Sequence, residues 1–135
     1  MEYSLGPLLR LAAKRAADAF AAALVPLDIE GRHFGVLLNL NRGGPANQRR
    51  LAGATGSDKS TMTRTIDELA ARGLVVRRAT EADRRVNVVE LTEAGRARFA
   101  EAERVAARVN DELLAHLTPE ERDGLRDHLR RFVEA

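Results

Sequence analysis

The sequence has 135 residues, of which 44% are hydrophobic and 31% are charged, and it contains no cysteine. Charges interrupt every apolar stretch before it reaches the roughly 20 residues of a membrane helix. The first residues lack a basic region followed by an apolar one, so we expect no secretion. The lack of cysteine excludes disulfide scaffolds, zinc fingers and thiol chemistry. We therefore expect one globular, cytoplasmic domain.

Basic side chains are concentrated in the middle of the chain. Residues 42–85 carry ten basic and five acidic side chains, whereas residues 86–135 carry eight basic and eleven acidic ones. Lys14 and Lys59 are the only lysines, so nearly all of the positive charge is arginine. The planar guanidinium group suits phosphates and the edge of guanine. This distribution predicts a central surface that faces a polyanion.

Apolar residues at helical spacing predict two helices at the start of the chain. The first covers residues 5–27 and is followed by Asp28. The second runs from about Glu30 to Arg42 and ends at the glycine pair Gly43-Gly44.

Two short helices are expected next, over residues 48–54 and 58–72. Asn47 and Ser57 stand where N-caps belong, because their side chains can accept hydrogen bonds from the first free backbone amides. Gly73 stands where a glycine ends a helix.

The period then changes from helical to extended. Residues 74–76 and 86–91 are rich in β-branched side chains, and the polar segment 80–83 lies between them. This pattern predicts a two-stranded hairpin. Since helices precede and follow it, we expect a mainly α fold with a small β-hairpin wing.

Helical spacing resumes after the hairpin. Thr92 is expected to cap a long helix whose apolar stripe consists of Phe99, Ala102, Ala106, Val109, Leu113 and Leu117. A capping box with proline at the first helical position, residues 118–121, predicts a last helix. The stripes of the first and last helices need partners, which favours a symmetric dimer. The alternative is that these helices pack on each other within one chain.

The two short helices are typical of a helix-turn-helix. Small and apolar residues occupy the positions where the helices cross, and a glycine lies at the turn between them. The structural residues of this motif are Leu51, Ala52, Gly56, Met62 and Ile66.

The second helix of the motif separates into an apolar and a polar face. Its polar residues gather in the first turns: Lys59, Ser60, Thr61, Thr63 and Arg64. Short hydroxyl side chains allow close approach to a duplex, and arginine can bond guanine through two N–H groups. The alternative is a solvated polar face, which explains the polarity but not the hydroxyl cluster. We predict that these residues bind DNA.

The hairpin brings a second group of arginines together. Four arginines fall within nine residues, and an aspartate precedes the last of them by two positions: Arg77, Arg78, Asp83, Arg84 and Arg85. Four like charges repel one another unless an anion lies near them. An arginine at a hairpin tip can enter a minor groove, with Asp83 orienting Arg85. The alternative, a solvated surface pair, is worth little. We therefore predict that Arg77, Asp83, Arg84 and Arg85 also bind DNA.

Residues 34–96 resemble the MarR family of bacterial winged-helix transcriptional regulators. The resemblance rests on Leu51-Ala52, the run 58–64, Asp67-Glu68-Leu69, Arg72-Gly73-Leu74-Val75, the wing signature Asp83-Arg84-Arg85 and the run 91–96. Two departures concern helix starts: Arg50 replaces a frequent acidic residue, and Glu30-Gly31 replaces the usual cap and proline.

The resemblance implies a homodimer on an inverted-repeat operator. Residues 1–29 and 92–135 would form the dimerisation helices, and residues 30–91 the winged helix-turn-helix lobe. By the same resemblance, Ser60, Thr61, Thr63 and Arg64 face the major groove of double-stranded DNA, while Arg85 enters the minor groove.

Members of the family commonly repress nearby genes and release DNA when a small aromatic or anionic ligand binds between the dimerisation helices and the lobe. Arg32 and His33 are candidates to border such a cleft, and the alternative for His33 is a half-buried capping residue. Sensing of oxidants through cysteine is excluded here.

Other classes of function lack the residues that they need. We find no catalytic constellation, and we predict a protein that is not an enzyme and has no cofactor. His33, His116 and His128 lie in three different predicted helices without zinc-site spacing. A metal-responsive regulator using Glu112 with His116 or His128 remains an alternative, although we predict no metal site. A winged-helix module that binds proteins instead of DNA is another.

Overall fold

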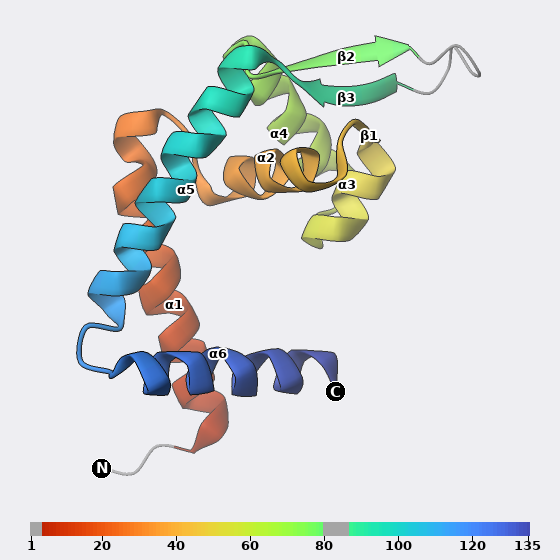
Figure 1. The fold of residues 1–135 in the computed structure, drawn as a ribbon. Helices are drawn as coiled ribbons and strands as arrows, with labels where there is room; N and C mark the ends of the chain where they lie inside the picture. The colour runs from red at the N-terminus through yellow and green to blue at the C-terminus, as the bar shows by residue number, and fades with distance from the viewer. Residues whose placement is uncertain (1–3, 80–86) are drawn as a thin grey trace.

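The computed structural model describes residues 4–79 and 87–135 (Figure 1). Helices form most of the described chain, and a small antiparallel sheet lies at one end. In chain order the elements are α1 (Leu5–Leu24), the 3-10 turn η1 (Val25–Leu27), α2 (Gly31–Gly43), β1 (Ala46–Asn47), α3 (Gln48–Thr55), α4 (Lys59–Ala71), β2 (Val75–Ala79), β3 (Asn87–Leu91), α5 (Glu93–Leu113) and α6 (Pro119–Glu134). The predicted mainly α fold with a hairpin wing is confirmed.

The first helix is shorter than its apolar pattern predicted. The α-helix ends at Leu24, and a 3-10 turn containing Pro26 replaces its last residues, because proline cannot donate to the preceding turn. Asp28 then adopts a left-handed conformation with φ of 54°. We refer to residues 27–33 as the α1–α2 junction.

Asn47 caps α3 as predicted, since its side chain accepts a hydrogen bond from the Arg50 amide. The prediction of Ser57 as the cap of α4 was wrong. Asp58 is the cap, with its Oδ1 atom 2.7 Å from the Thr61 amide nitrogen. The Ser57 hydroxyl instead lies 3.0 Å from the hydroxyl of Thr55, the last residue of α3, and forms a hydrogen bond with it.

A third strand joins the predicted hairpin. The sheet has the order β1-β3-β2, and both pairs of strands are antiparallel. In the added pair, Ala46 lies opposite Val89 and Asn47 opposite Val88. This pairing fixes the start of α3 against the sheet, because β1 ends where α3 begins.

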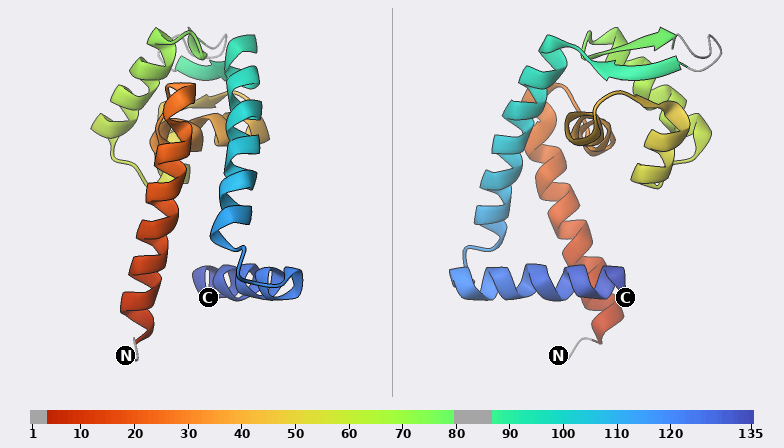
Figure 2. Two further views of the ribbon diagram at one scale, coloured as in Figure 1. Left: turned by 90° about the vertical axis from the view of Figure 1, so that its left-hand side faces the viewer. Right: turned by 45° about the vertical axis from the view of Figure 1, so that its right-hand side comes forward.

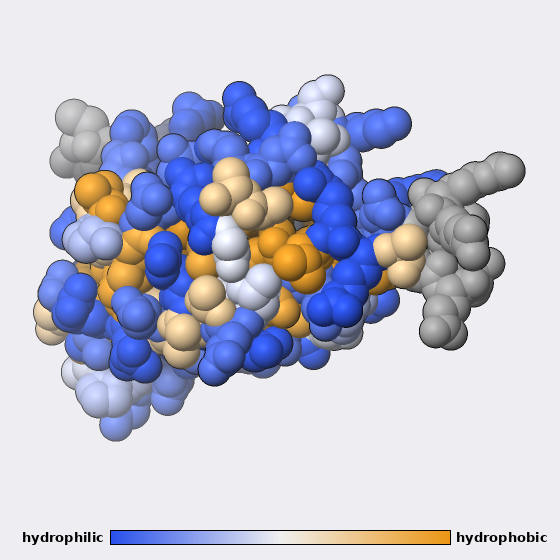
Figure 3. Space-filling view, turned by 90° about the horizontal axis from the view of Figure 1, so that it is seen from above, coloured by the Kyte–Doolittle hydropathy of each residue, from blue (hydrophilic) through white to orange (hydrophobic). Residues whose placement is uncertain are grey.

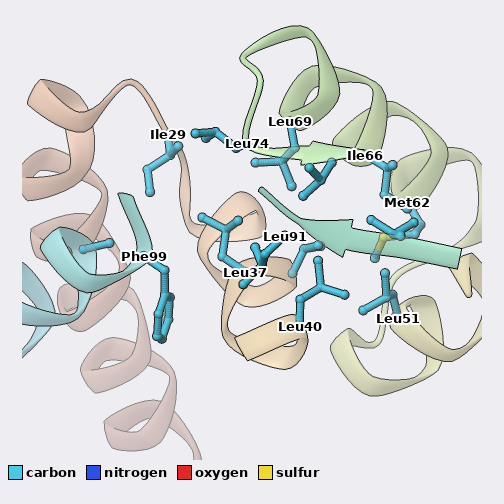
Figure 4. Close-up of a cluster of buried hydrophobic side chains, with 14 of the residues drawn as sticks. Ile29, Leu37, Leu40, Leu51, Met62, Ile66, Leu69, Leu74, Leu91 and Phe99 are labelled. Atoms are coloured by element: carbon cyan, nitrogen blue, oxygen red, sulfur yellow. The ribbon is translucent and has the colours of Figure 1, made fainter. Parts of the chain in front are cut away.

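The hydrophobic core lies between the sheet and the helices α2, α3, α4 and α5 (Figure 4). Its fully buried members include Leu37, Leu51, Met62, Ile66, Leu69 and Leu74. Leu24 and Phe99, from the long helices, belong to the same cluster. Seen from the sheet end, apolar side chains show in the middle of this face and hydrophilic ones surround them (Figure 3).

The long helices α1 and α5 lie side by side and extend away from the sheet, and α6 follows the far end of α5 and runs crosswise to it (Figure 2). Aromatic rings join these helices to the lobe: Phe34 of α2 packs edge-on against Phe20 of α1 and stacks on Phe99 of α5, with ring centroids 5.0 and 5.6 Å apart.

The last helix has the predicted capping box at Thr118 and Glu121. The helix before it ends at Leu113, which contradicts the longer stripe that we predicted. Leu117 and His116 lie in the turn between the two helices, where the Leu117 amide donates to the Leu114 carbonyl. Within residues 4–79 and 87–135, the helices are all too short or too polar to span a bilayer.

Candidate nucleic-acid interface

The helix-turn-helix consists of α3 and α4. Leu51 of α3 and Met62 and Ile66 of α4 are buried in the shared core, and Ala52 packs at its edge. Gly56 has φ of 70°, a left-handed conformation that glycine adopts without steric cost, and it lets the chain reverse between the helices. The buried side of α4 therefore determines which of its residues face outward.

The first turns of α4 present a polar surface. Lys59, Ser60 and Arg64 are exposed, whereas Thr61 and Thr63 are half-buried. Among the described residues, neither Lys59 nor Arg64 has a carboxylate within ion-pair distance. The backbone amides at the start of α4 add partial positive charge to these cations.

The start of α3 contributes groups that the sequence interpretation missed. The Gln48 side-chain nitrogen donates to the Thr63 hydroxyl at 2.5 Å, and that hydroxyl donates to the Lys59 carbonyl at 2.9 Å. Arg49 and Arg50 are exposed, and they also lack a carboxylate partner in the described part of the chain. Their position two and three residues after the capping Asn47 was the available signal, because residues in a first helical turn lie beside the free amides.

The two wing arginines in the described part of the chain, Arg77 and Arg78, both form ion pairs. Arg77 bonds Asp67 of α4 through Nη2 and Oδ1 at 2.5 Å, and Arg78 pairs with Glu90 of β3 at 3.0 Å. Carboxylates of neighbouring elements therefore supply negative charge beside both arginines, and the DNA contact predicted for Arg77 stays a prediction. The other predicted wing residues, Asp83, Arg84 and Arg85, lie outside the described residues.

Arg32 and His33, the predicted cleft residues, make contacts inside the lobe. Arg32 forms a two-pronged ion pair with Glu68 of α4 and also contacts Glu30 at 2.7 Å. His33 is fully buried, and its Nδ1 atom accepts a hydrogen bond from the Glu30 amide at 2.9 Å. The alternative of a capping histidine is therefore confirmed, with the correction that the ring is buried rather than half-buried.

The burial and charges around this cluster shift two pKa values. Burial lowers the pKa of His33, and the positive charges of Arg32 and Arg72 lower it further, so the ring is neutral near pH 7. The hydrogen bonds from Arg32 lower the pKa of the Glu68 carboxyl to about 2.

Two cavities border the helices. A cavity of about 190 Å³ lies between the end of α2 and α3, and Arg42, Arg50 and Asn39 contribute to its lining. A larger, open cavity of about 530 Å³ lies between α1 and α5, where alanines of α1 face Val109 and Leu113, and Arg15, Arg108 and Glu112 supply charge. Within residues 4–79 and 87–135, His, Asp and Glu side chains form no cluster of three that could hold a metal ion.

A helix-turn-helix followed by an antiparallel hairpin defines the winged-helix class of DNA-binding folds. A sequence profile of the MarR family matches residues 27–86. Together with solved relatives that are 32% identical over 96% of this chain, this match shows that the chain belongs to the MarR family of transcriptional regulators.

Three solved structures illustrate the similarity. The repressor CouR from Rhodococcus jostii RHA1, bound to a 23-mer DNA duplex, is 32% identical with a TM-score of 0.90, over 96% of this chain and 92% of CouR. A probable transcriptional regulator from Pseudomonas aeruginosa is 32% identical with a TM-score of 0.85, over 96% of both chains. BpsR from Bordetella bronchiseptica is 29% identical with a TM-score of 0.86, over 100% of this chain and 99% of BpsR.

Proposed function

We propose that this regulator is a repressor that binds an inverted-repeat operator as a homodimer and leaves it when a small aromatic or anionic molecule binds. The observation that carries the proposal is the group of exposed cations at the starts of α3 and α4: Arg49, Arg50, Lys59 and Arg64. They lie beside two helix N-termini and have no ion-pair partner among the described carboxylates. Such a surface attracts the phosphates of a duplex.

Within this proposal, α4 reads the major groove and the wing reads the minor groove. Ser60, Thr61 and Arg64 supply the donors and acceptors that contact bases, and Thr63 positions Gln48 beside them. Arg85, oriented by Asp83, enters the minor groove, and Arg77 and Arg84 lie beside the adjoining phosphates. The DNA-bound structure of CouR supports this proposal, because its fold closely matches that of the present chain.

The proposal of a homodimer rests on the apolar surface of α1 and α6. Leu125, Leu129, Phe132 and Val133 recur on a single side of α6, and Phe132 and Val133 are 60% and 80% exposed. All 16 residues of α6 stay exposed or half-buried in the described structure. Leu5, Leu8 and Leu11 form a second exposed row on α1. Burying each large side chain contributes roughly 1.5–3 kcal/mol, so a second copy covering both rows stabilises the pair.

The same surfaces suggest which segments form the dimer and which bind DNA. Residues 1–29 and 92–135 supply the dimerisation helices, and residues 30–91 form the DNA-binding lobe. The hydrophobic core contains residues from both parts, since Leu24 and Phe99 pack with residues of the lobe. A displacement of the dimerisation helices therefore moves the lobe as well.

We place the effector in the cavity between α1 and α5. Its alanine and valine lining accepts an aromatic ring, and Arg15 and Arg108 offer charge to a carboxylate or phosphate. Two relatives support a small-molecule effector: CouR was solved with p-coumaroyl-CoA, and 6-hydroxynicotinic acid regulates the DNA binding of BpsR.

Salt dependence of duplex binding tests the DNA-binding function. The wild-type chain should lose affinity steeply as salt rises, because several phosphates are neutralised per lobe. Arg64→Ala should weaken binding to a selected duplex by about 1–3 kcal/mol. Arg104→Ala, which removes an exposed arginine of α5, is the matched control and should change little. Absence of duplex binding at low salt would instead favour the protein-binding module.

Sedimentation of an α6 variant tests the dimer. Leu129→Asp places a charge in the apolar row and should give a monomer at concentrations where the wild type is dimeric. Arg130→Gln changes the charge by the same amount outside the apolar row and should leave the dimer intact. A monomeric wild-type chain would refute the proposed assembly.

A further inference from the structure

Glu68 lies in the second half of α4, behind the residues proposed to contact DNA. Its carboxylate accepts hydrogen bonds from both terminal nitrogens of Arg32, and the Nη2–Oε2 distance is 3.1 Å. Arg32 belongs to the first turn of α2, and the same guanidinium lies 3.4 Å from the Thr65 hydroxyl of α4. The planar two-pronged geometry fixes direction as well as distance, so this pair constrains how α4 lies against α2.

His33 places a second donor beside the same carboxylate. Because its Nδ1 atom accepts from the Glu30 amide, the neutral ring carries its hydrogen on Nε2. Nε2 is buried, has no hydrogen-bond partner among the described residues, and lies 3.7 Å from Oε1 of Glu68. A buried N–H without a partner is costly. Both Arg32 and His33 therefore favour a carboxylate at position 68.

A third contact ties the end of α4 to the α1–α2 junction. The Nε atom of Arg72 lies 3.2 Å from Asp28, and its Nη1 atom donates to the Glu68 carbonyl at 3.1 Å. Arg98 of α5 donates to the Leu27 carbonyl at 2.5 Å. The junction is therefore bonded to α4 on one side and to α5 on the other.

We propose that Glu68 is a positioning residue for DNA recognition: held by Arg32 and His33, it sets the tilt at which α4 presents its first turns to the major groove. This inference rests on the proposed DNA-binding function. Residue 60 precedes Glu68 by eight positions, which is about 12 Å along a helix, so a tilt of about 10° around Glu68 moves residue 60 by roughly 2 Å. A displacement of that size exceeds the tolerance of hydrogen bonds to base edges.

Removing the Glu68 charge distinguishes a positioning role from a general effect of charge on DNA affinity. Glu68→Gln deletes a negative charge close to the proposed DNA surface, and charge alone predicts tighter binding to every duplex. Loss of positioning predicts weaker discrimination between sequences, because contacts to phosphates tolerate displacement better than contacts to bases. The ratio of affinities for two duplexes therefore distinguishes the two effects.

The experiment compares a duplex selected by the wild-type chain from a randomised library with a scrambled duplex of the same length and composition. Glu68→Gln and Arg32→Gln should each lower the affinity ratio about tenfold, the scale of coupling between residues in contact. The double variant should be no worse than either single variant, because both remove one interaction. Glu103→Gln, which deletes an exposed charge on α5, should leave the ratio unchanged.

A ratio for Glu68→Gln within about twofold of wild type, or losses that add in the double variant, would overturn the inference. A merely structural role would lower the melting temperature and both affinities together. Should Glu68→Gln fail to fold, Arg32→Lys keeps the charge, removes the two-pronged bond and should lower the ratio. A wild-type chain that binds neither duplex would refute the proposed function and the inference with it, a result distinct from wild-type binding with unchanged discrimination.

Discussion

Gly95 is the position where one added methyl group should damage the fold most clearly. It lies in the first turn of α5, packed against the chain that leads into β2. A Cβ atom built there would lie 2.0 Å from the Leu74 carbonyl oxygen and 3.2 Å from a methyl group of Leu91. Carbon–oxygen contacts normally begin near 3.3 Å, so the start of α5 and the backbone at Leu74 would have to separate by about 1 Å.

That separation would strain the hydrogen bonds that hold the start of α5. The Thr92 amide donates to the Leu74 carbonyl at 3.1 Å, and the Thr92 hydroxyl donates to the Gly73 carbonyl at 2.7 Å. Overpacking lowers the free energy of unfolding by about 1–3 kcal/mol, and each weakened hydrogen bond lowers it by about 1 kcal/mol. The better helix propensity of alanine offsets about 1 kcal/mol of this loss. We expect Gly95→Ala to lower stability by about 2–4 kcal/mol, or about 10 °C in melting temperature.

Circular dichroism melts at equal protein concentrations measure this loss, because association makes the melting temperature depend on concentration. Gly53→Ala is the matched control. Gly53 is an exposed helical glycine of α3, and in the described part of the chain its added methyl group would meet no atom within 4 Å. This control should melt slightly above wild type, since alanine favours the helix. A Gly95→Ala protein that melts as high as the control would refute the packing argument.

Two further predictions concern the wing and the buried histidine. Arg85→Ala should weaken operator binding by about 1–3 kcal/mol and leave the melting temperature nearly unchanged, and equal losses in both measurements would contradict a DNA contact. The pKa of His33 is near 6.5 in the unfolded chain and lower in the folded one. The neutral ring therefore contributes fully to the free energy of unfolding above pH 6.5, and this contribution is lost as the pH falls below that value. Denaturant melts of His33→Gln should therefore show a flatter stability profile just below pH 6.5, and a profile as steep as wild type would exclude His33 as its source. Glu68 affects stability in a separate, more acidic pH range. Its contribution to the free energy of unfolding is present above pH 4.5 and is lost as the pH falls toward its folded pKa of about 2.

The sequence predicted features that depend on local chemistry. The caps at Asn47 and Thr92 could be identified because a cap bonds amides only two or three residues away. Ser57 and Asp58 are both good caps, and the fold distinguishes them: the Ser57 hydroxyl lies beside that of Thr55, whereas the Asp58 carboxylate accepts from the Thr61 amide. The strand β1 has two residues and thus no period to detect.

The charges of the candidate site were harder to predict, because charge density does not reveal pairing. The cluster of wing arginines was evident, whereas their partners Asp67 and Glu90 lie 10 and 12 positions away in other elements. Likewise, Arg32 and Glu68 are 36 positions apart, so no pattern in the sequence connects them. The glycine in the run 91–96 was visible, but its close approach to Leu74 follows only from the fold.

In the proposed homodimer, the exposure of α6 would make the lifetime of this regulator depend on its concentration. A helix of 16 residues that packs on no core is only marginally stable by itself in water. Isolated chains should therefore carry a frayed, protease-sensitive tail, whereas a second copy would shield it. If the chain dimerises as proposed, dilution would favour degradation of single molecules, and the intact chain would persist mainly as the dimer.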